Sequence, residues 1–138
     1  MRIWLDTEFN GFGGELISIG MVDEYERPFY AVLECTAPTP WVAENVIPKL
    51  AFDSIDRPAL QMAMRRYLCQ FNEIEVIADW PEDLAHFCAL LITAPGECMA
   101  LPPLTMTLCT YAPEPSEFPH NALHDARALR RAGMRGLL

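Results

Sequence analysis

Residues 3–22, IWLDTEFNGFGGELISIGMV, decide the fold class that this chain can adopt. A strand is predicted at residues 2–8, where an apolar run ends in polar side chains, and the glycines at 11–14 provide a turn. The apolar run at residues 15–22 predicts a second strand. A third strand is expected at residues 28–35, close enough behind the second to form a hairpin with it.

Helices and strands alternate in the rest of the chain. Apolar residues at helical spacing predict a helix at residues 57–71, with Pro58 near its start. The pattern of residues 41–50 is ambiguous, and a short helix is one interpretation of it. Further elements are expected as strands at 75–78 and 104–109 and as helices at 83–92 and 121–132. The resulting order, β-β-β-α-β-α-β-α, predicts an α/β fold in which a mixed β-sheet is flanked by α-helices.

The length and composition of the chain fit one domain. It has 138 residues, of which 51% are hydrophobic, so we expect a single domain over residues 1–138. No apolar run approaches the ~18 residues that span a bilayer, and no signal peptide is recognisable. We therefore expect a soluble, cytoplasmic protein without membrane partners. The five cysteines are widely spaced and form no C-x-x-C pair, which favours reduced thiols over a zinc site or disulfides.

The net charge of −9 restricts the partners that this protein can bind. A nucleic-acid-binding protein usually carries a basic surface, so this chain should not bind long duplexes tightly. Bound divalent cations would add positive charge where acidic residues cluster. The acidity therefore fits either ordinary solubility or a site that metal ions complete.

Two acidic residues stand at the end of the first expected strand. Because side chains alternate along a strand, Asp6 and Glu8 share one face, while Ile3 and Leu5 share the other. The two carboxylates are then roughly 7 Å apart. Without partners they repel each other, and one pKa should rise. Bound Mg²⁺ resolves this conflict, since hard cations prefer carboxylate oxygens; the alternative is a strand that ends in solvent.

The last expected helix carries one acid at the edge of its apolar side. On a helical wheel, Asp125 falls beside the stripe formed by Ala122, Ala126, Leu129 and Gly133. The arginines lie largely on the other side: Arg127, Arg130, Arg131 and Arg135. An unpaired charge that faces a sheet is costly, which favours metal ligation by Asp125 over an ion pair with a nearby arginine. The arginines form either a solvated face or contacts to phosphate groups.

One histidine and three further acids complete the candidate set. His120 precedes the last helix, where it either faces solvent or takes a proton from water near neutral pH. Asp79, Glu82 and Asp83 follow the fourth expected strand and compete as third metal ligand, because α/β folds place ligands at strand ends. Asp83 also suits the N-cap of the next helix.

These motifs, taken in order, resemble the DEDDh superfamily of 3′→5′ exonucleases. The family motifs are D-x-E, a mid-chain Asp and H-x4-D on an RNase H-like fold, and this chain has DTE at residues 6–8 and HNALHD at 120–125. The stretch DTEFNGFGGELISIGMV and the later ALPP at 100–103 are similar to the short bacterial exoribonucleases of the RNase AS type. The resemblance covers nearly the whole chain and implies an RNase H-like sheet.

The resemblance implies a role for each motif residue. His120 would be the general base, and the carboxylates that bind the two divalent cations, Mg²⁺ or alternatively Mn²⁺, would be Asp6, Glu8, Asp83 and Asp125. All five side chains would be catalytic. Asp83 is preferred as the middle acid because it opens a helix, as in the family pattern. Asp79 remains the alternative, and Glu82 stands where the family pattern has an aromatic residue.

The implied activity is that of a 3′→5′ exoribonuclease, a hydrolase that converts single-stranded RNA 3′ ends to nucleoside 5′-monophosphates. Enzymes of the RNase AS type are described as Mg²⁺-dependent dimers that prefer adenylate-rich 3′ ends, so a homodimer is expected. Phe9, Phe12 and Leu16 follow the first motif and are candidates to bind the terminal base of the substrate by stacking. Core packing is the alternative for each of them.

Three other functions stay open from the sequence. A 3′→5′ exodeoxyribonuclease of the proofreading type would use the same chemistry, and only contacts to the ribose 2′-OH distinguish RNA from DNA. A catalytically silent nucleic-acid-binding module is disfavoured by the complete set of acids and by the net charge of −9, which weakens passive binding. A metal-dependent phosphoesterase acting on small nucleotides also suits an acidic surface.

Overall fold

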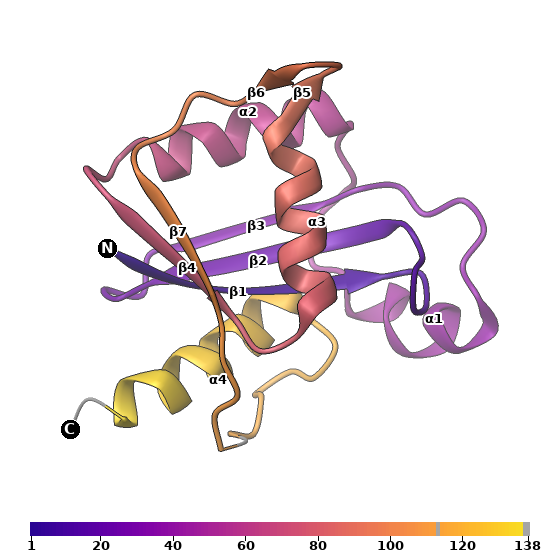
Figure 1. The fold of residues 1–138 in the computed structure, drawn as a ribbon. Coiled ribbons are helices and arrows are strands. Elements are labelled where there is room, and N and C mark those ends of the chain that lie inside the picture. The colour runs from indigo at the N-terminus through magenta and orange to yellow at the C-terminus, as the bar shows by residue number, and fades with distance from the viewer. Residues whose placement is uncertain (113, 137–138) are drawn as a thin grey trace.

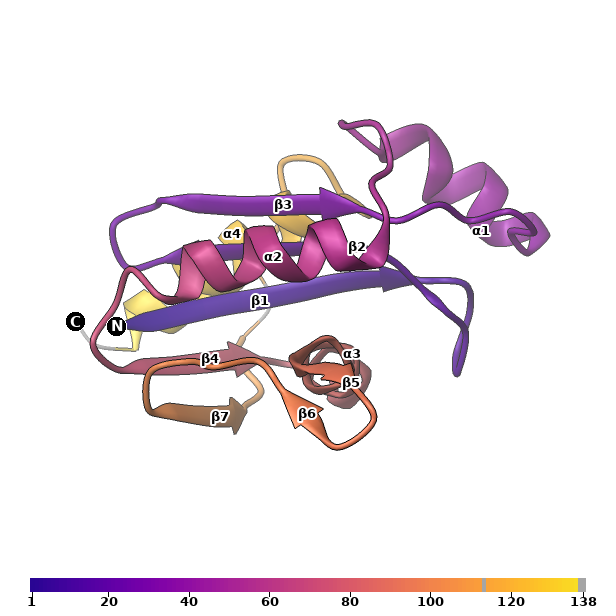
Figure 2. The same ribbon diagram turned by 90° about the horizontal axis from the view of Figure 1, so that it is seen from above.

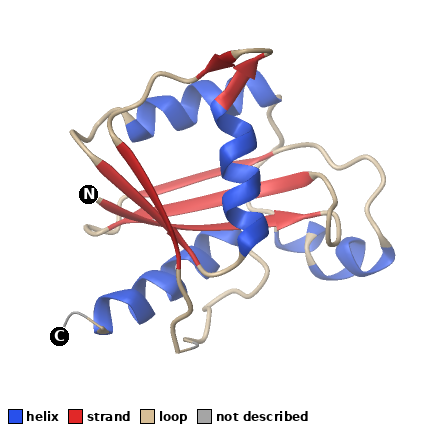
Figure 3. Ribbon diagram, viewed as in Figure 1, coloured by secondary structure: helices blue, strands red, loops and turns tan. Residues whose placement is uncertain are grey.

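The computed structural model describes residues 1–112 and 114–136, and it confirms a mixed α/β fold with a five-stranded sheet (Figures 1 and 3). Its strands are β1 (Arg2–Phe9), β2 (Leu16–Asp23), β3 (Pro28–Val32), β4 (Ile74–Ala78), β5 (Ile92–Ala94), β6 (Glu97–Cys98) and β7 (Leu104–Leu108). Its helices are α1 (Pro40–Asn45), the 3-10 helix η1 (Ile47–Lys49), α2 (Arg57–Leu68), α3 (Pro81–Leu91) and α4 (Ala122–Arg135). Within the described residues, no helix is long and apolar enough to cross a bilayer.

The sheet combines antiparallel and parallel pairs in the order β3-β2-β1-β4-β7. β2 pairs antiparallel with both β1 and β3, whereas β4 pairs parallel with both β1 and β7. Short turns suffice for the antiparallel pairs, and the parallel pairs require the longer connections through α2 and α3. The two kinds of pairing meet at β1, the strand that carries Asp6 and Glu8.

The two faces of the sheet bury different side chains. Ile3 and Leu5 of β1 belong to a core that α2 and α3 complete with Leu60, Met64, Leu68, Phe87 and Leu90. Trp4 points to the opposite face and packs against α4. Figures 1 and 2 show α2 and α4 on opposite sides of the strands. Because side chains alternate, Asp6 and Glu8 lie on the same face as Trp4, toward α4.

Gly20 of β2 allows α4 to approach the sheet closely. A Cβ atom at Gly20 would lie 2.4 Å from the carbonyl carbon of Ala122 and 2.4 Å from the nitrogen of Leu123. Gly20 is also the residue of β2 that pairs with Asp6. The absence of a side chain at this position therefore brings the first turn of α4, with Asp125, beside Asp6.

Replacing Gly20 by Ala should destabilise the protein by roughly 1–3 kcal/mol or more, because the new methyl group collides with backbone that cannot rotate away. Urea unfolding followed by circular dichroism measures this change. Gly136→Ala is the matched control, since a Cβ atom there meets its nearest neighbour, the Gly133 carbonyl oxygen, at an ordinary 3.6 Å. Equal midpoints for the two variants would contradict the close packing of α4 on β2.

The structure differs from the predicted elements in their number and in two of their bounds. Residues 41–50 contribute to α1 and η1, and the short β5–β6 hairpin precedes β7, so the order contains elements that the sequence did not predict. α3 begins at Pro81 rather than at residue 83, and the strand predicted at 28–35 ends at Val32. The strands of the hairpin, three and two residues long, are too short to show an alternating pattern.

Candidate active site

Five carboxylates gather at one end of β1 and β4 and form two overlapping groups. Asp6, Glu8 and Asp125 make the first group, and Asp6, Asp79 and Asp83 make the second. Within each group, one carboxylate oxygen from every residue lies within 4.8 Å of the others. The structure thus brings together the four acids that the sequence singled out, and Asp6 belongs to both groups.

The topology of the sheet explains how distant residues meet. β1 and β4 are adjacent and parallel, so their carboxyl ends lie at the same edge of the sheet. Asp79 follows β4 directly, and Asp83 lies in the first turn of the next helix, α3. Asp125 comes from the first turn of α4, which packs on Gly20. The site is therefore assembled from three segments that end at one edge.

Asp79 and Asp83 both belong to the site, although the sequence presented them as alternatives. Asp83 is buried, and its Oδ1 accepts hydrogen bonds from Thr7 N at 3.1 Å and Thr7 Oγ1 at 2.6 Å. It is not the N-cap of α3, since that position belongs to Trp80. Asp79 is exposed at the rim of the same group. A cation held by this group would have a ligand of fixed orientation in Asp83 and a solvent-accessible ligand in Asp79.

Glu82, the third competitor for the middle position, has a different role. Its Oε2 accepts a hydrogen bond of 2.9 Å from the backbone nitrogen of Gly13, in the turn that follows β1. Within the described part of the chain, Glu82 belongs to neither carboxylate group. It ties the glycine-rich turn, which contains Phe12, to the start of α3.

The carboxylates are in an environment that disfavours their charged forms. Burial, followed by the charges of Asp83 and Glu8, raises the pKa of Asp6 well above its usual range. Burial, followed by the charge of Asp125, raises the pKa of Glu8 to about 8. Burial also raises the pKa of Asp83 to about 7, against the effect of its hydrogen bonds to Thr7.

A divalent cation fits this donor set. Among the described residues, the buried Oδ2 of Asp6 has no hydrogen-bond partner. Hard cations such as Mg²⁺ and Mn²⁺ take carboxylate oxygens as ligands. A cation would supply both the missing partner for Asp6 and the positive charge that the cluster lacks. The donor set is therefore one that can hold a hard divalent cation, and the identity of that cation stays a prediction.

The stability of the metal-free protein should decrease as the pH rises from about 4 to about 8. In this range the folded protein holds protons on Glu8 and Asp83 that the unfolded chain has released, so raising the pH favours unfolding. The expected loss is on the order of a few kcal/mol. Thermal unfolding in EDTA measures it, and added Mg²⁺ should raise the Tm at about pH 8 far more than at about pH 5. An equal Mg²⁺ effect at both pH values would contradict the metal site.

His120 lies beside the first carboxylate group. It adopts a left-handed backbone conformation with φ of 66°, and its backbone nitrogen donates to Asp125 Oδ2 at 3.1 Å. A cavity of about 360 Å³ is lined by His120 together with Asp6, Glu8, Asp79, Asp83 and Asp125. His120 thus borders the space in which the carboxylates meet.

The ion pairs of α4 leave Asp125 free for this site. In the described residues, Arg130 pairs with Glu26 and Arg135 pairs with Glu114, and neither they nor another arginine forms an ion pair with Asp125. The alternative interpretation of Asp125, a local ion pair, is therefore wrong for residues 1–112 and 114–136. The separation of acid and arginines around the helix follows the predicted helical wheel.

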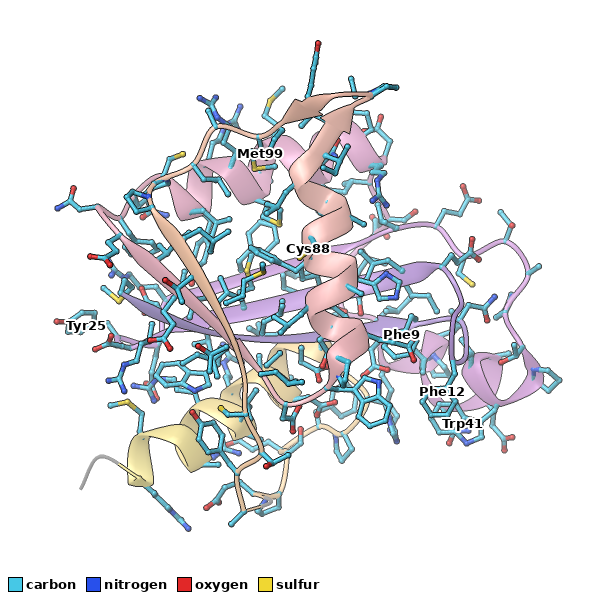
Figure 4. The ribbon with its side chains drawn as sticks, viewed as in Figure 1. Phe9, Phe12, Tyr25, Trp41, Cys88 and Met99 are labelled. Atoms are coloured by element: carbon cyan, nitrogen blue, oxygen red, sulfur yellow. The ribbon has the colours of Figure 1, made fainter. Side chains whose placement is uncertain are left out.

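An apolar slot opens next to the carboxylates. It has a volume of about 440 Å³ and is lined by Phe9, Phe12 and Trp41 together with Gly11, Val42, Thr7 and Glu8. Figure 4 shows Phe9, Phe12 and Trp41 gathered at one end of the molecule. The side chain of Phe12 is 84% exposed and that of Trp41 is 55% exposed. Large exposed aromatic surfaces are unusual for a monomer and indicate a binding site.

Two tryptophans of this region were missed by the sequence analysis. The ring of Trp41 meets His120 edge-on with centroids 5.2 Å apart, and the ring of Trp80 lies 6.0 Å from Phe12. Asn10 explains the approach of Trp41, because it bonds both the nitrogen of Thr39 and the carbonyl of Ala37 just before α1. The sequence did contain a signal for these two residues, because each tryptophan stands next to a proline at the start of a helix, α1 or α3.

Leu16 does not belong to the slot, so its prediction as a substrate-binding residue is wrong. Its side chain is 5% exposed and packs in the core with Ile3, Leu5 and Ile19. Leu16 begins β2, where the pairing shifts by one residue between Glu8 and Phe9. The core alternative holds for Leu16, whereas Phe9 and Phe12 line the slot, and their binding of a terminal base stays a prediction.

The comparisons with known proteins add no assignment, because no family model and no curated protein matches this chain. The chemistry must therefore be inferred from the site. Two groups of carboxylates can hold hard cations, a histidine can accept a proton, and an aromatic slot can stack on a planar ring.

Proposed function

We propose that this protein is a metal-dependent 3′→5′ exoribonuclease that hydrolyses the terminal phosphodiester of single-stranded RNA. The observation that carries the proposal is the position of Asp6 in both carboxylate groups. A carboxylate shared by two groups is what a pair of cations about 3.5–4 Å apart requires. The order of the motifs and the central place of β1 support an RNase H-like fold of the DEDDh type.

The side chains divide into two sets of cation ligands. Glu8 and Asp125 would hold one cation with Asp6, and Asp79 and Asp83 would hold the other, also with Asp6. When bound, the two cations would polarise the scissile phosphate and make water a better nucleophile. Thr7 fixes the orientation of Asp83 through its two hydrogen bonds, so the second set is positioned before a ligand arrives.

His120 would act as the general base. His120 lines the same cavity as Asp6 and Asp125, so its ring would be close to a water molecule that attacks the phosphate held there. The bond from phosphorus to the 3′ oxygen breaks, the water oxygen stays on phosphorus, and the product is a nucleoside 5′-monophosphate. The contacts of the His120 backbone with Asp125 and of its ring with Trp41 hold the imidazole in place.

The aromatic slot would receive the terminal base. Phe12 and Trp41 offer ring faces, and stacking on an aromatic side chain is worth about 1–3 kcal/mol per base. A base must be unpaired to enter such a slot, which favours single strands. The net charge of −9 gives the surface little affinity for long phosphate chains, which favours short oligonucleotides and RNA ends.

The test of this function is a time course on 5′-labelled RNA and DNA of equal sequence, with Mg²⁺ or with EDTA. We expect a ladder that shortens from the 3′ end, depends on Mg²⁺ and advances faster on RNA. A faster ladder on DNA would keep the mechanism and move the function to exodeoxyribonuclease. Cleavage of neither substrate by a protein that binds metal would contradict the proposal and favour a small-nucleotide phosphoesterase or a silent binding module.

Trp41→Ala should lower kcat/KM on single-stranded RNA about tenfold or more, because the terminal base loses one stacking surface. Metal affinity should stay unchanged, since Trp41 belongs to neither carboxylate group. Steady-state kinetics and calorimetry measure the two properties separately. Tyr25→Ala is the matched control: Tyr25 is 72% exposed and lies at the opposite end of the molecule in Figure 4. Equal losses in the two variants would contradict the role of the slot.

A further inference from the structure

A second cavity opens on the carboxylates from the side of α4. It has a volume of about 270 Å³ and shares Asp6, Asp79 and Asp125 with the cavity on the aromatic side. Its remaining polar walls come from the segment between β7 and α4, at Tyr111, Glu114 and Ser116. Three of the carboxylates therefore border two cavities, and the proposed function uses only one of them.

The walls of this second cavity are rich in hydrogen-bond acceptors. The side chain of Glu114 is 13% exposed and is held by Arg135, which is itself 74% exposed. The hydroxyl of Ser116 interacts with Asp125. Tyr111 adds one aromatic ring, and α4 lines the floor with small residues such as Ala128 and Ala132. Such a cavity repels phosphate groups and suits a neutral group that carries hydroxyl donors.

The position of the cavity relative to the aromatic slot limits what can occupy it. A phosphodiester joins two nucleosides, and the scissile phosphate must lie at the carboxylates. If the terminal nucleoside occupies the aromatic slot, the other nucleoside must extend from the scissile phosphate in a different direction. The second cavity touches Asp6, Asp79 and Asp125 but not Phe12 or His120, so it provides that side.

We infer that the second cavity binds the penultimate nucleoside of the substrate, and that Glu114 accepts a hydrogen bond from its ribose 2′-hydroxyl. This inference rests on the proposed exonuclease function and adds a residue that distinguishes RNA from DNA. A carboxylate is a strong acceptor and a 2′-hydroxyl is a donor that only ribose supplies. The penultimate sugar, rather than the terminal one, then sets the preference for RNA.

The inference predicts a position-specific effect of removing one 2′-hydroxyl. We would compare three 5′-labelled pentaribonucleotides, one all-ribose, one with a single 2′-deoxynucleotide at the penultimate position, and one with it at the terminal position. In a single turnover with Mg²⁺, the first cleavage of the penultimate-deoxy substrate should be about tenfold slower or more, because a hydrogen bond to a charged group is lost. The terminal-deoxy substrate should be cleaved at nearly the all-ribose rate.

Variants of two glutamates complete the test. Glu114→Met keeps the side-chain length but removes the acceptor. This variant should therefore cleave the all-ribose substrate more slowly than the unaltered protein does. It should cleave the all-ribose and the penultimate-deoxy substrates at the same rate. Glu117→Met, an exposed neighbour outside this cavity, should keep the full discrimination. Equal first-cleavage rates on the three substrates with the unaltered protein would overturn the inference and leave the exonuclease function intact. Absence of cleavage on every substrate would overturn both.

Discussion

Asp6→Asn should abolish both cation binding and turnover, with kcat falling at least about 10³-fold, because the substitution removes the one ligand common to both carboxylate groups. Asn has nearly the shape of Asp but lacks the negative charge, so the packing around β1 is kept. Calorimetric titration with Mn²⁺ and a Mg²⁺-dependent cleavage assay measure the two losses on the same preparation.

The stability of this variant distinguishes a lost ligand from a lost fold. In EDTA at about pH 8, Asp6→Asn should be at least as stable as the unaltered protein, because burial and neighbouring charges disfavour ionised Asp6. Asp53→Asn, at an exposed acid outside both groups, is the control and should keep metal binding and activity. Full activity of purified Asp6→Asn would remove Asp6 from the mechanism.

His120→Ala should keep metal binding and lose about 10²- to 10⁴-fold in kcat, the usual contribution of a general base. His120 lines the cavity but belongs to neither carboxylate group among the described residues, so the cation ligands remain complete. Cleavage kinetics and Mn²⁺ titration of the purified variant separate the two properties.

His124→Gln provides the matched control for His120→Ala. His124 lies in α4, four residues after His120, packs against Phe118 and does not line the carboxylate cavity. This variant should retain most of the activity. If His120→Ala and His124→Gln lose activity equally, the loss reflects the start of α4 and not a proton transfer.

The elements of the site with a strict local pattern could be predicted from the sequence. The two-residue period of a strand places Asp6 and Glu8 on one face, and the helical wheel places Asp125 on the apolar edge of α4, as the structure shows. Both arguments need only neighbouring residues. They do not reveal that Gly20 admits α4 so closely that these acids meet.

The remaining features depend on tertiary contacts that a local pattern does not contain. Asp79 and Asp83 compete in sequence, but both reach Asp6 because β4 runs parallel to β1. Trp41 joins the slot through the hydrogen bonds of Asn10 to the segment before α1. Leu16 follows the glycine-rich turn that contains Phe12, and only the burial of Leu16 in the structure shows that it belongs to the core and not to the slot.

The central claim is that Asp6 serves two cations, and a crystal structure with saturating Mn²⁺ tests it most directly. The anomalous scattering of manganese locates each ion independently of the protein density. We expect two anomalous peaks, one among Asp6, Glu8 and Asp125 and the other among Asp6, Asp79 and Asp83. A single peak, or no peak at these carboxylates, would contradict the two-cation mechanism.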